Sequence, residues 1–343
     1  MTPRRWLLTV LSFAMAIGVS VYIIAAGWPE GGAPLGLPWW AHLAALGLVA
    51  LDMVARVLKI QLSARAVGVP VAFGTALRTS FGGDFAASIT PSRSGAEPAR
   101  FLVLKEAGYH IQSVLVVIFM ELLLELISLL AITIGCFVLL DHSSAVVTAL
   151  LAMVGGMSAF VLGGGGLALW ISRRHGSGPA PQWMVALGVR PPFWHRIQTS
   201  LNHLRESMSQ LRHAEPVTMT LALVCSILHV LTRLAILPLL VYAYGDRPPL
   251  APLVVWPLAL LYGSAVAPAP AGGGVVELSF RAALGHHIPA HLLASSLIWW
   301  RVYSFYAYLL LGALSTGRTV MRALRPDRNG AAAPVADGEQ ATA

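Results

Sequence analysis

The residues best suited to chemistry stand in two short stretches that interrupt apolar sequence with proline and glycine. The first stretch contains, in chain order, Pro91, Arg93, Gly95, Glu97 and Arg100. Arginine suits phosphate because its planar guanidinium group donates two hydrogen bonds at once. The sequence therefore predicts a site for an anionic group, with a structural ion pair between Glu97 and a nearby arginine as the alternative.

The second stretch has the same character and lies in the other half of the chain. It contains Pro270, Gly272, Gly273, Gly274, Glu277 and Arg281. Glycines allow backbone conformations and close approaches that other residues rarely adopt. A nucleotide-binding loop is not expected, because no Lys-Ser or Lys-Thr pair follows the glycines. The same two alternatives, a polar site or a structural ion pair, apply to this stretch.

Further charged residues stand inside long apolar runs. Glu121 and Glu125 lie one helical turn apart in one run, and Arg301 lies in another. We expect Arg301 to pair with one of these two glutamates. A buried ion pair is weak evidence for stability, so its presence in lipid favours a functional or conformational role over simple locking of helices. Structural pairing is the expectation for the other charges in these runs, Asp52, Arg56 and Arg233.

The composition identifies the elements that must position these residues. The chain of 343 residues is 57% hydrophobic and only 11% charged, whereas a soluble domain carries about 25% charged residues. This is the composition of an integral membrane protein. Six apolar runs are long enough to span a bilayer: 6–27, 39–58, 111–140, 145–171, 216–244 and 290–316. The first run exceeds a signal-peptide core of about 7–15 residues, so we expect it to be retained.

The distribution of lysine and arginine predicts the topology, because these residues mark the cytoplasmic side. They gather near the N-terminus, in segments 59–110 and 172–215, and in the C-terminal tail. Both termini are therefore expected in the cytoplasm. Segment 71–108 must then enter and leave on the cytoplasmic side, and segment 250–287 must enter and leave on the outer side. Each is predicted to be a re-entrant helical hairpin.

The two halves of the chain match with opposite orientation. Residues 1–140 and 145–316 each supply two spans, a hairpin and one further span, which predicts an inverted-topology repeat. Glu121 follows Glu97 at the same separation at which Arg301 follows Glu277. Coincidence is the alternative, because glycine and proline are frequent in membrane helices. The fold class expected is an all-α polytopic helical bundle with an inverted repeat and two re-entrant hairpins.

The remaining segments are expected to be peripheral. Segment 193–213 carries apolar residues at helical spacing and predicts an amphipathic helix on the cytoplasmic membrane surface. The membrane domain is expected to occupy 1–318, followed by a tail, 319–343, that is basic and then disordered. The two cysteines, Cys136 and Cys225, stand in predicted spans and indicate neither a disulfide nor a metal site.

At the two proline–glycine stretches the sequence resembles a known family, the flippase-like membrane domain of lysylphosphatidylglycerol synthases and flippases. The resemblance rests on 91–100 with Leu104, Gly108, Glu121 and Glu125, and on 268–277 with Arg301 and Gly312. It extends over about residues 5–318. It implies a helical lipid-translocating domain, without the soluble aminoacyltransferase domain that the bifunctional members add.

The sequence departs from the family pattern at two positions. The family often has arginine directly after the first acid of the span, where this chain has Leu122, and it usually has aspartate where this chain has Glu125. These departures bear on the subfamily and the substrate. Some short relatives are associated with hopanoid, isoprenoid-linked or sphingolipid-type pathways, and the sequence does not choose among them.

Together these observations predict a multi-pass protein of the bacterial cytoplasmic (inner) membrane that moves a polar or charged lipid between leaflets. No ATP-binding motif is present, so movement is expected to be passive or ion-coupled, with Glu97, Glu121 and Glu277 as candidate proton carriers. The alternatives are a secondary transporter of a small anion and a non-transporting partner of a lipid-synthesising enzyme. An enzyme is the least expected class, because no nucleophile, base and orienting residue occur together.

The expected partners are membrane lipids, with a lipid-biosynthetic enzyme and a second copy of the chain as further candidates. No cofactor, metal or nucleic acid is expected. The net charge of +8 is explained by the membrane topology rather than by binding to nucleic acid.

Overall fold

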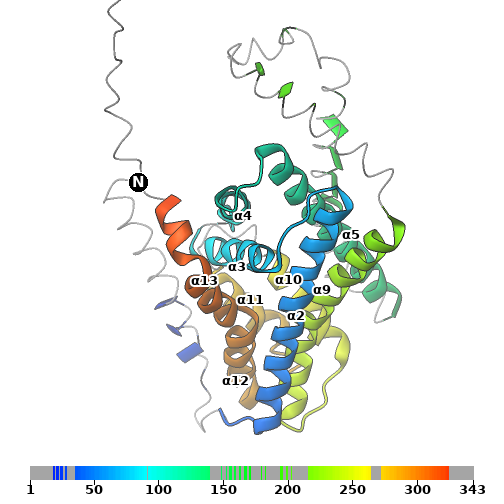
Figure 1. The fold of residues 1–343 in the computed structure, drawn as a ribbon. Helices are drawn as coiled ribbons and strands as arrows, with labels where there is room; N and C mark the ends of the chain where they lie inside the picture. The colour runs from blue at the N-terminus through cyan, green and yellow to red at the C-terminus, as the bar shows by residue number, and fades with distance from the viewer. Residues whose placement is uncertain are drawn as a thin grey trace, which may run out of the picture.

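The computed structural model describes residues 35–90, 92–139, 215–263 and 272–323, with scattered positions at 18–28 and 148–202. Every regular element in these ranges is helical (Figure 1). The predicted spans 6–27 and 145–171 and the predicted surface helix 193–213 lie largely outside the described residues, as does most of the predicted tail.

The first half of the chain supplies two long helices with two shorter ones between them. They are α2 (Trp39–Ala66), α3 (Phe73–Ile89), α4 (Ala96–Glu106) and α5 (Ile111–Leu139). The second half also combines long and short helices, in a different order. These helices are α9 (Pro216–Ala243), α10 (Leu250–Gly263), α11 (Val275–Leu284), α12 (Ala290–Arg301), the π-helical η2 (Val302–Tyr306) and α13 (Ala307–Ala323).

The first proline–glycine stretch ends α3 for a local reason. A residue before proline avoids helical conformation, and Thr90 is extended with φ −115° and ψ 144°. Ser92 and Arg93 then adopt φ values of 52° and 55°, which are uncommon for residues with a side chain. The chain restarts as α4 with Glu97 in its first turn, where the helix dipole favours a negative charge.

The second stretch shows why glycine is needed there. Gly272 and Gly274 have φ values of 64° and 82°, which glycine adopts without steric cost. Helix α11 begins directly afterwards, and the Glu277 carboxylate accepts a hydrogen bond of 2.9 Å from the Gly274 amide. The predicted special conformation of these glycines is therefore confirmed at both positions.

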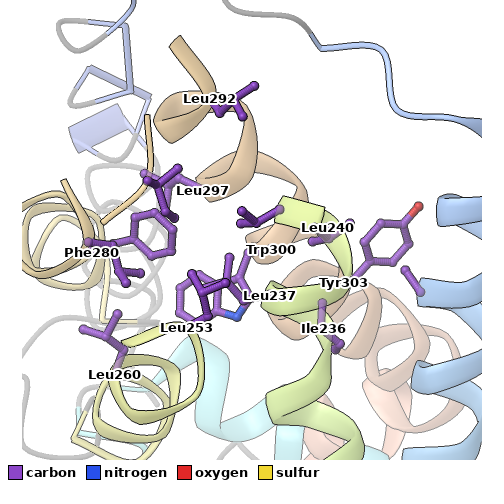
Figure 2. Packing of buried hydrophobic residues seen from close by; sticks show 14 of the residues in the cluster. Ile236, Leu237, Leu240, Leu253, Leu260, Phe280, Leu292, Leu297, Trp300 and Tyr303 are labelled. Atoms are coloured by element: carbon purple, nitrogen blue, oxygen red, sulfur yellow. The ribbon is translucent and has the colours of Figure 1, made fainter. Parts of the chain in front are cut away.

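Apolar packing joins helices within the first half of the chain and between the two halves. Helices α2 and α9 run side by side, and α13 packs on α3 (Figure 1). One hydrophobic cluster joins α9 to α12, and Figure 2 shows Trp300 at its centre beside Phe280 and Leu237. A second cluster joins the C-terminal half of α2 to α3, α4 and α5.

Three of the described helical segments are long and apolar enough to cross a membrane. They are Ser113–Leu139, Pro216–Ala243 and Ala290–Thr316. Helix α2 is not among them by composition, yet it is 28 residues long. It also exposes large apolar side chains along its length, including Leu43, Leu51, Val54 and Leu58. Exposed apolar faces of this extent mark contact with a membrane or a partner.

Candidate functional site

A cavity of about 610 Å³ lies between α2, α3, α4, α5, α9 and α10. Charged and hydrogen-bonding side chains make up much of its wall. They are Arg56, Lys59, Asp84, Arg93, Glu97, Arg100, Glu121, Glu125, His229, Arg233 and Tyr262. The cavity therefore gathers five lysine and arginine side chains and four carboxylates in the interior of an apolar protein.

The position of these residues along their helices places the cavity at mid-depth. Glu121 and Glu125 stand near the middle of α5, and His229 and Arg233 stand near the middle of α9. Both helices are long enough to span a bilayer. Ionised groups at this depth are costly unless they face a cavity or a partner, and here they do both.

Lys59 of α2 connects two acids of α5. Its Nζ lies 2.7 Å from Oε2 of Glu125 and 3.8 Å from Oε1 of Glu121. Lys59 is buried, as is Glu121. One cation thus attracts both glutamates and joins two helices that are distant in sequence.

Glu125 has two further partners, each from a different helix. His229 of α9 lies with its Nε2 2.8 Å from Glu125 Oε2, and the Tyr262 hydroxyl donates to Oε1 at 3.1 Å. The other ring nitrogen of His229 lies 3.3 Å from Oδ1 of Asp52. His229 therefore links Glu125, which lines the cavity, to Asp52, which does not.

Arg56 connects α2 to the first short helix. It forms an ion pair with Asp84 of α3, and its Nη1 also lies 3.9 Å from the Asp52 carboxylate. The predicted pairing of Asp52 with Arg56 is confirmed, but the stronger partner of Arg56 comes from α3. All three residues are buried.

Arg100 of α4 forms ion pairs with two acids, Glu97 on its own helix and Glu121 on α5. Its Nη1 lies 3.0 Å from Glu97 Oε1 and 3.3 Å from Glu121 Oε1. Glu97 and Glu121 each have a second carboxylate oxygen that is buried without a hydrogen-bond partner, and Arg100 has a buried Nε in the same state. Buried polar groups normally find partners, so these atoms are able to bind a ligand.

The described residues of the second proline–glycine stretch do not line the large cavity. Glu277 is fully buried, and Nε of Arg301 lies 2.9 Å from its Oε1. The Arg301 guanidinium also faces the ring of Phe305, 4.6 Å from its centroid. Arg301 lines a second chamber of about 30 Å³, whereas Glu277 lines neither cavity. Arg281 is exposed at the surface.

The structure corrects one predicted partnership. Arg301 was expected to pair with Glu121 or Glu125, but it pairs with Glu277. The cause is that α11 and α12 follow one another and pack together, whereas Glu121 and Glu125 are already neutralised by cations from α2 and α4. Each half thus contains an ion pair between a short helix and the helix that follows it, Arg100 with Glu121 in the first half and Glu277 with Arg301 in the second.

The remaining predicted residues divide into two groups. Gly95 belongs to the turn, where its amide donates to Thr90 Oγ1 at 2.9 Å and a Cβ atom would lie 2.9 Å from the Ala86 carbonyl oxygen. Gly272, Gly273 and Gly274 line neither cavity. Pro91 and Pro270 lie outside the described residues.

Sequence reasoning missed three residues that the cavity contains. Lys59 stands one turn after Arg56 on α2, which was a usable signal, because both positions share a helix face. His229 and Tyr262 gave no signal of their own, since single polar residues in apolar helices are common. Arg233 was expected to pair structurally, yet it lines both cavities.

Comparison with known proteins places the chain in a family of membrane proteins. No curated protein sequence matches the chain significantly. The family model described as the lysylphosphatidylglycerol synthase TM region matches residues 11–312. That range includes every residue of the cavity wall and both proline–glycine stretches. A match of this extent associates the protein with the modification or flipping of lipids. The chain is a membrane protein that belongs to the lysylphosphatidylglycerol synthase TM region family.

Proposed function

We propose that the protein moves a polar or charged lipid between the two leaflets of the membrane. The observation that carries this proposal is the charged cavity at mid-depth of the helices. A headgroup crossing a bilayer has to leave water, and interior charges offset that cost by replacing its hydration. The cavity volume of about 610 Å³ suits a headgroup, since small-molecule sites range from about 300 to 1,000 Å³.

The wall of the cavity also has an apolar side. Leu122, Leu129, Val154 and Leu261 line it together with the charged residues. A lipid presents both surfaces at its glycerol region, with a polar headgroup on one side and acyl chains on the other. This mixed lining supports a lipid over a small hydrophilic ion, which needs polar groups all round.

We also propose the inverted repeat with two re-entrant hairpins as the framework of this path. The supporting observation is a matching ion pair in each half. Arg100 of α4 pairs with Glu121 of α5, and Glu277 of α11 pairs with Arg301 of α12. In both halves a short helix after a proline–glycine break is tied to the following long helix, with the signs of the charges exchanged.

In this proposal the charged residues bind and guide the lipid and perform no covalent chemistry. Movement is passive or coupled to an ion, and membrane lipids are the partners. The distribution of lysine and arginine supports cytoplasmic termini in a bacterial inner membrane. Association with a lipid-biosynthetic enzyme or with a second copy of the chain is compatible with the same role.

The test is lipid exchange in vesicles that contain the purified protein. Vesicles carry trace fluorescent analogues of phosphatidylglycerol, phosphatidylethanolamine or phosphatidylserine, and an external reductant bleaches the outer leaflet. The protein should raise the bleached fraction from about half toward completion for at least one analogue. Protein-free vesicles, and vesicles with the exposed-site variant Arg65→Gln, provide the baseline and the positive control.

The two alternative functions predict different results with the same vesicles. A transporter of small anions takes up labelled phosphate or sulfate into the vesicles while every lipid analogue stays in its leaflet. A non-transporting partner of an enzyme shows neither activity. Either result, obtained with folded protein and the whole lipid panel, contradicts the proposal.

A further inference from the structure

Two arginines stand at the junction of the two cavities. Arg93 and Arg233 line both the large cavity and the chamber of about 30 Å³, and Arg301 lines only the chamber. Arg93 comes from the turn between α3 and α4, and Arg233 comes from the middle of α9. The two halves of the chain therefore each contribute one guanidinium group to the same point.

These two arginines differ from the other cations of the large cavity in their partners. Arg56, Lys59 and Arg100 each form ion pairs with carboxylates. Among the residues that the structure describes, no carboxylate lies within ion-pair distance of Arg93 or Arg233. Their positive charge is therefore available to a bound anion.

The surroundings of Arg233 fix its guanidinium, while the two carboxylates that attract it, Asp52 and Asp84, form no ion pair with it. Its Nη2 donates to the Ser304 carbonyl oxygen at 3.1 Å, and its Cζ lies 4.5 Å from the centroid of the Tyr308 ring. The carbonyl belongs to the π-helical turn η2, a kind of irregularity frequent at functional sites. The buried Nε has no hydrogen-bond partner.

The backbone at Arg93 adopts a costly conformation. Both Ser92 and Arg93 have left-handed φ values, and such conformations persist where the surrounding structure requires them, often at ligand sites. The charges that act on Arg93 include Arg233 and Arg100, which repel it, and Asp84, which attracts it. An anion between Arg93 and Arg233 would remove this repulsion.

We propose that Arg93 and Arg233 together bind the phosphate group of an anionic phospholipid at this junction. This inference rests on the proposed lipid movement and names the group that the site recognises. Guanidinium groups bind phosphate by paired, charge-assisted hydrogen bonds. The chamber has room for about one water molecule, so the phosphate occupies the large cavity.

The test measures binding separately from movement. Protein purified in dodecyl maltoside, without phosphate buffer, is titrated calorimetrically with three probes: dioctanoyl phosphatidic acid, dioctanoylglycerol and inorganic phosphate. Phosphatidic acid should bind most tightly. Arg93→Gln and Arg233→Gln should each weaken it by at least tenfold, whereas Arg65→Gln, a substitution at an exposed position of α2, should leave it unchanged.

The probes distinguish the possible sources of the phosphate. Binding of dioctanoylglycerol that equals that of phosphatidic acid contradicts phosphate recognition. Inorganic phosphate that binds as tightly as phosphatidic acid, with the same dependence on both arginines, contradicts the lipid source and assigns the site to a free anion. Because no transport is measured, a failure here leaves lipid movement standing, and a failure of lipid movement leaves this binding result standing.

Charge-retaining variants guard against loss of folding. Arg93→Lys and Arg233→Lys keep the positive charge but not the planar fork that binds phosphate through two bonds. If a glutamine variant does not fold, the lysine variant should still weaken phosphatidic acid several-fold. Unchanged affinity in folded variants at both positions overturns the proposal.

Discussion

The Nζ of Lys59 lies 2.7 Å from the Glu125 carboxylate. The same ammonium group lies 3.8 Å from a second buried acid, Glu121, which also has Arg100 at 3.3 Å. Lys59 of α2 thus pairs with Glu125 and shares Glu121 with Arg100 of α4. Removing a single partner of a buried ion pair leaves an uncompensated charge, which is more damaging than removing the whole pair. This relationship makes Lys59 a sharp test of how the cavity wall is held together.

Lys59→Met should destabilise the protein strongly, by about 3–5 kcal/mol as for other broken buried pairs. Lys59→Met combined with Glu125→Gln should recover much of that loss, because fewer buried charges then lack a partner. The thermal midpoint and folded yield in detergent measure both effects. Lys105→Met, at an exposed position of α4, is the control. A double variant as poor as the sum of its singles argues against the pairing.

The pair formed by Glu277 and Arg301 should behave in the same way in the second half of the chain. Arg301→Gln leaves a fully buried carboxylate, which retains only the Gly274 amide as a partner among the contacts resolved here. We expect a large fall in the thermal midpoint and a partial recovery when Glu277→Gln is added. Arg247→Gln, at an exposed position after α9, should leave the midpoint unchanged. Recovery from Glu125→Gln instead would support the partnership that the sequence suggested.

Packing of α13 on α3 depends on a glycine. A Cβ atom at Gly312 would lie 2.6 Å from the Phe81 carbonyl oxygen and 2.8 Å from the Cβ of Phe85. Gly312→Ala should therefore push the two helices apart and lower the thermal midpoint. Gly135→Ala is the matched control, because a Cβ there meets nothing within 4 Å. That change should be neutral or stabilising by about 0.5–1 kcal/mol, as alanine favours a helix over glycine.

The long helices were predictable because apolar runs of sufficient length leave the backbone little alternative in a membrane. The runs 111–140 and 216–244 match α5 and α9 within one residue at each end, and the interruptions followed from local rules for proline and glycine. The residues of the cavity were harder to predict from the sequence. Glu97, Arg100, Glu121 and Glu125 were identified because each stood in an unusual sequence context.

The partners of those residues were not predictable, because they depend on how the helices pack. Lys59, His229 and Tyr262 come from three different helices, α2, α9 and α10, and nothing in their local sequence indicates that they meet at Glu125. The error over Arg301 has the same origin. An opposite charge somewhere in another span was taken as a partner, whereas Glu277 on the preceding helix, α11, lies nearer to Arg301.

The proposed opposite orientation of the two re-entrant hairpins, 71–108 and 250–287, can be tested independently of the cavity. Cysteines introduced singly at Lys105 and His286, two exposed positions, in a background without Cys136 and Cys225, should react with impermeant reagents from opposite sides. Lys105→Cys should react only from the cytoplasm, and His286→Cys only from outside, because the charge distribution requires hairpins of opposite direction. Labelling of both positions from one side contradicts the inverted repeat and leaves the cavity unaffected.

Glu97 separates a role in lipid movement from a role in holding the structure. It lines the large cavity, pairs with Arg100, and has a buried carboxylate oxygen without a partner. Glu97→Gln keeps the size and hydrogen bonding of the side chain but removes its charge. Arg100 retains Glu121 at 3.3 Å, so the variant should fold with a thermal midpoint close to that of the wild type.

Lipid exchange by Glu97→Gln should nevertheless slow by at least tenfold in the fluorescent vesicle assay, because the headgroup path loses one of its four charged acids. The matched control is Glu106→Gln on the same helix, where the glutamate pairs with Arg78 at the surface. That variant should exchange lipid at the wild-type rate. The comparison uses the analogue that the wild type moves fastest. If Glu97→Gln and Glu106→Gln exchange that lipid equally fast, Glu97 belongs to the scaffold of the cavity and not to the path.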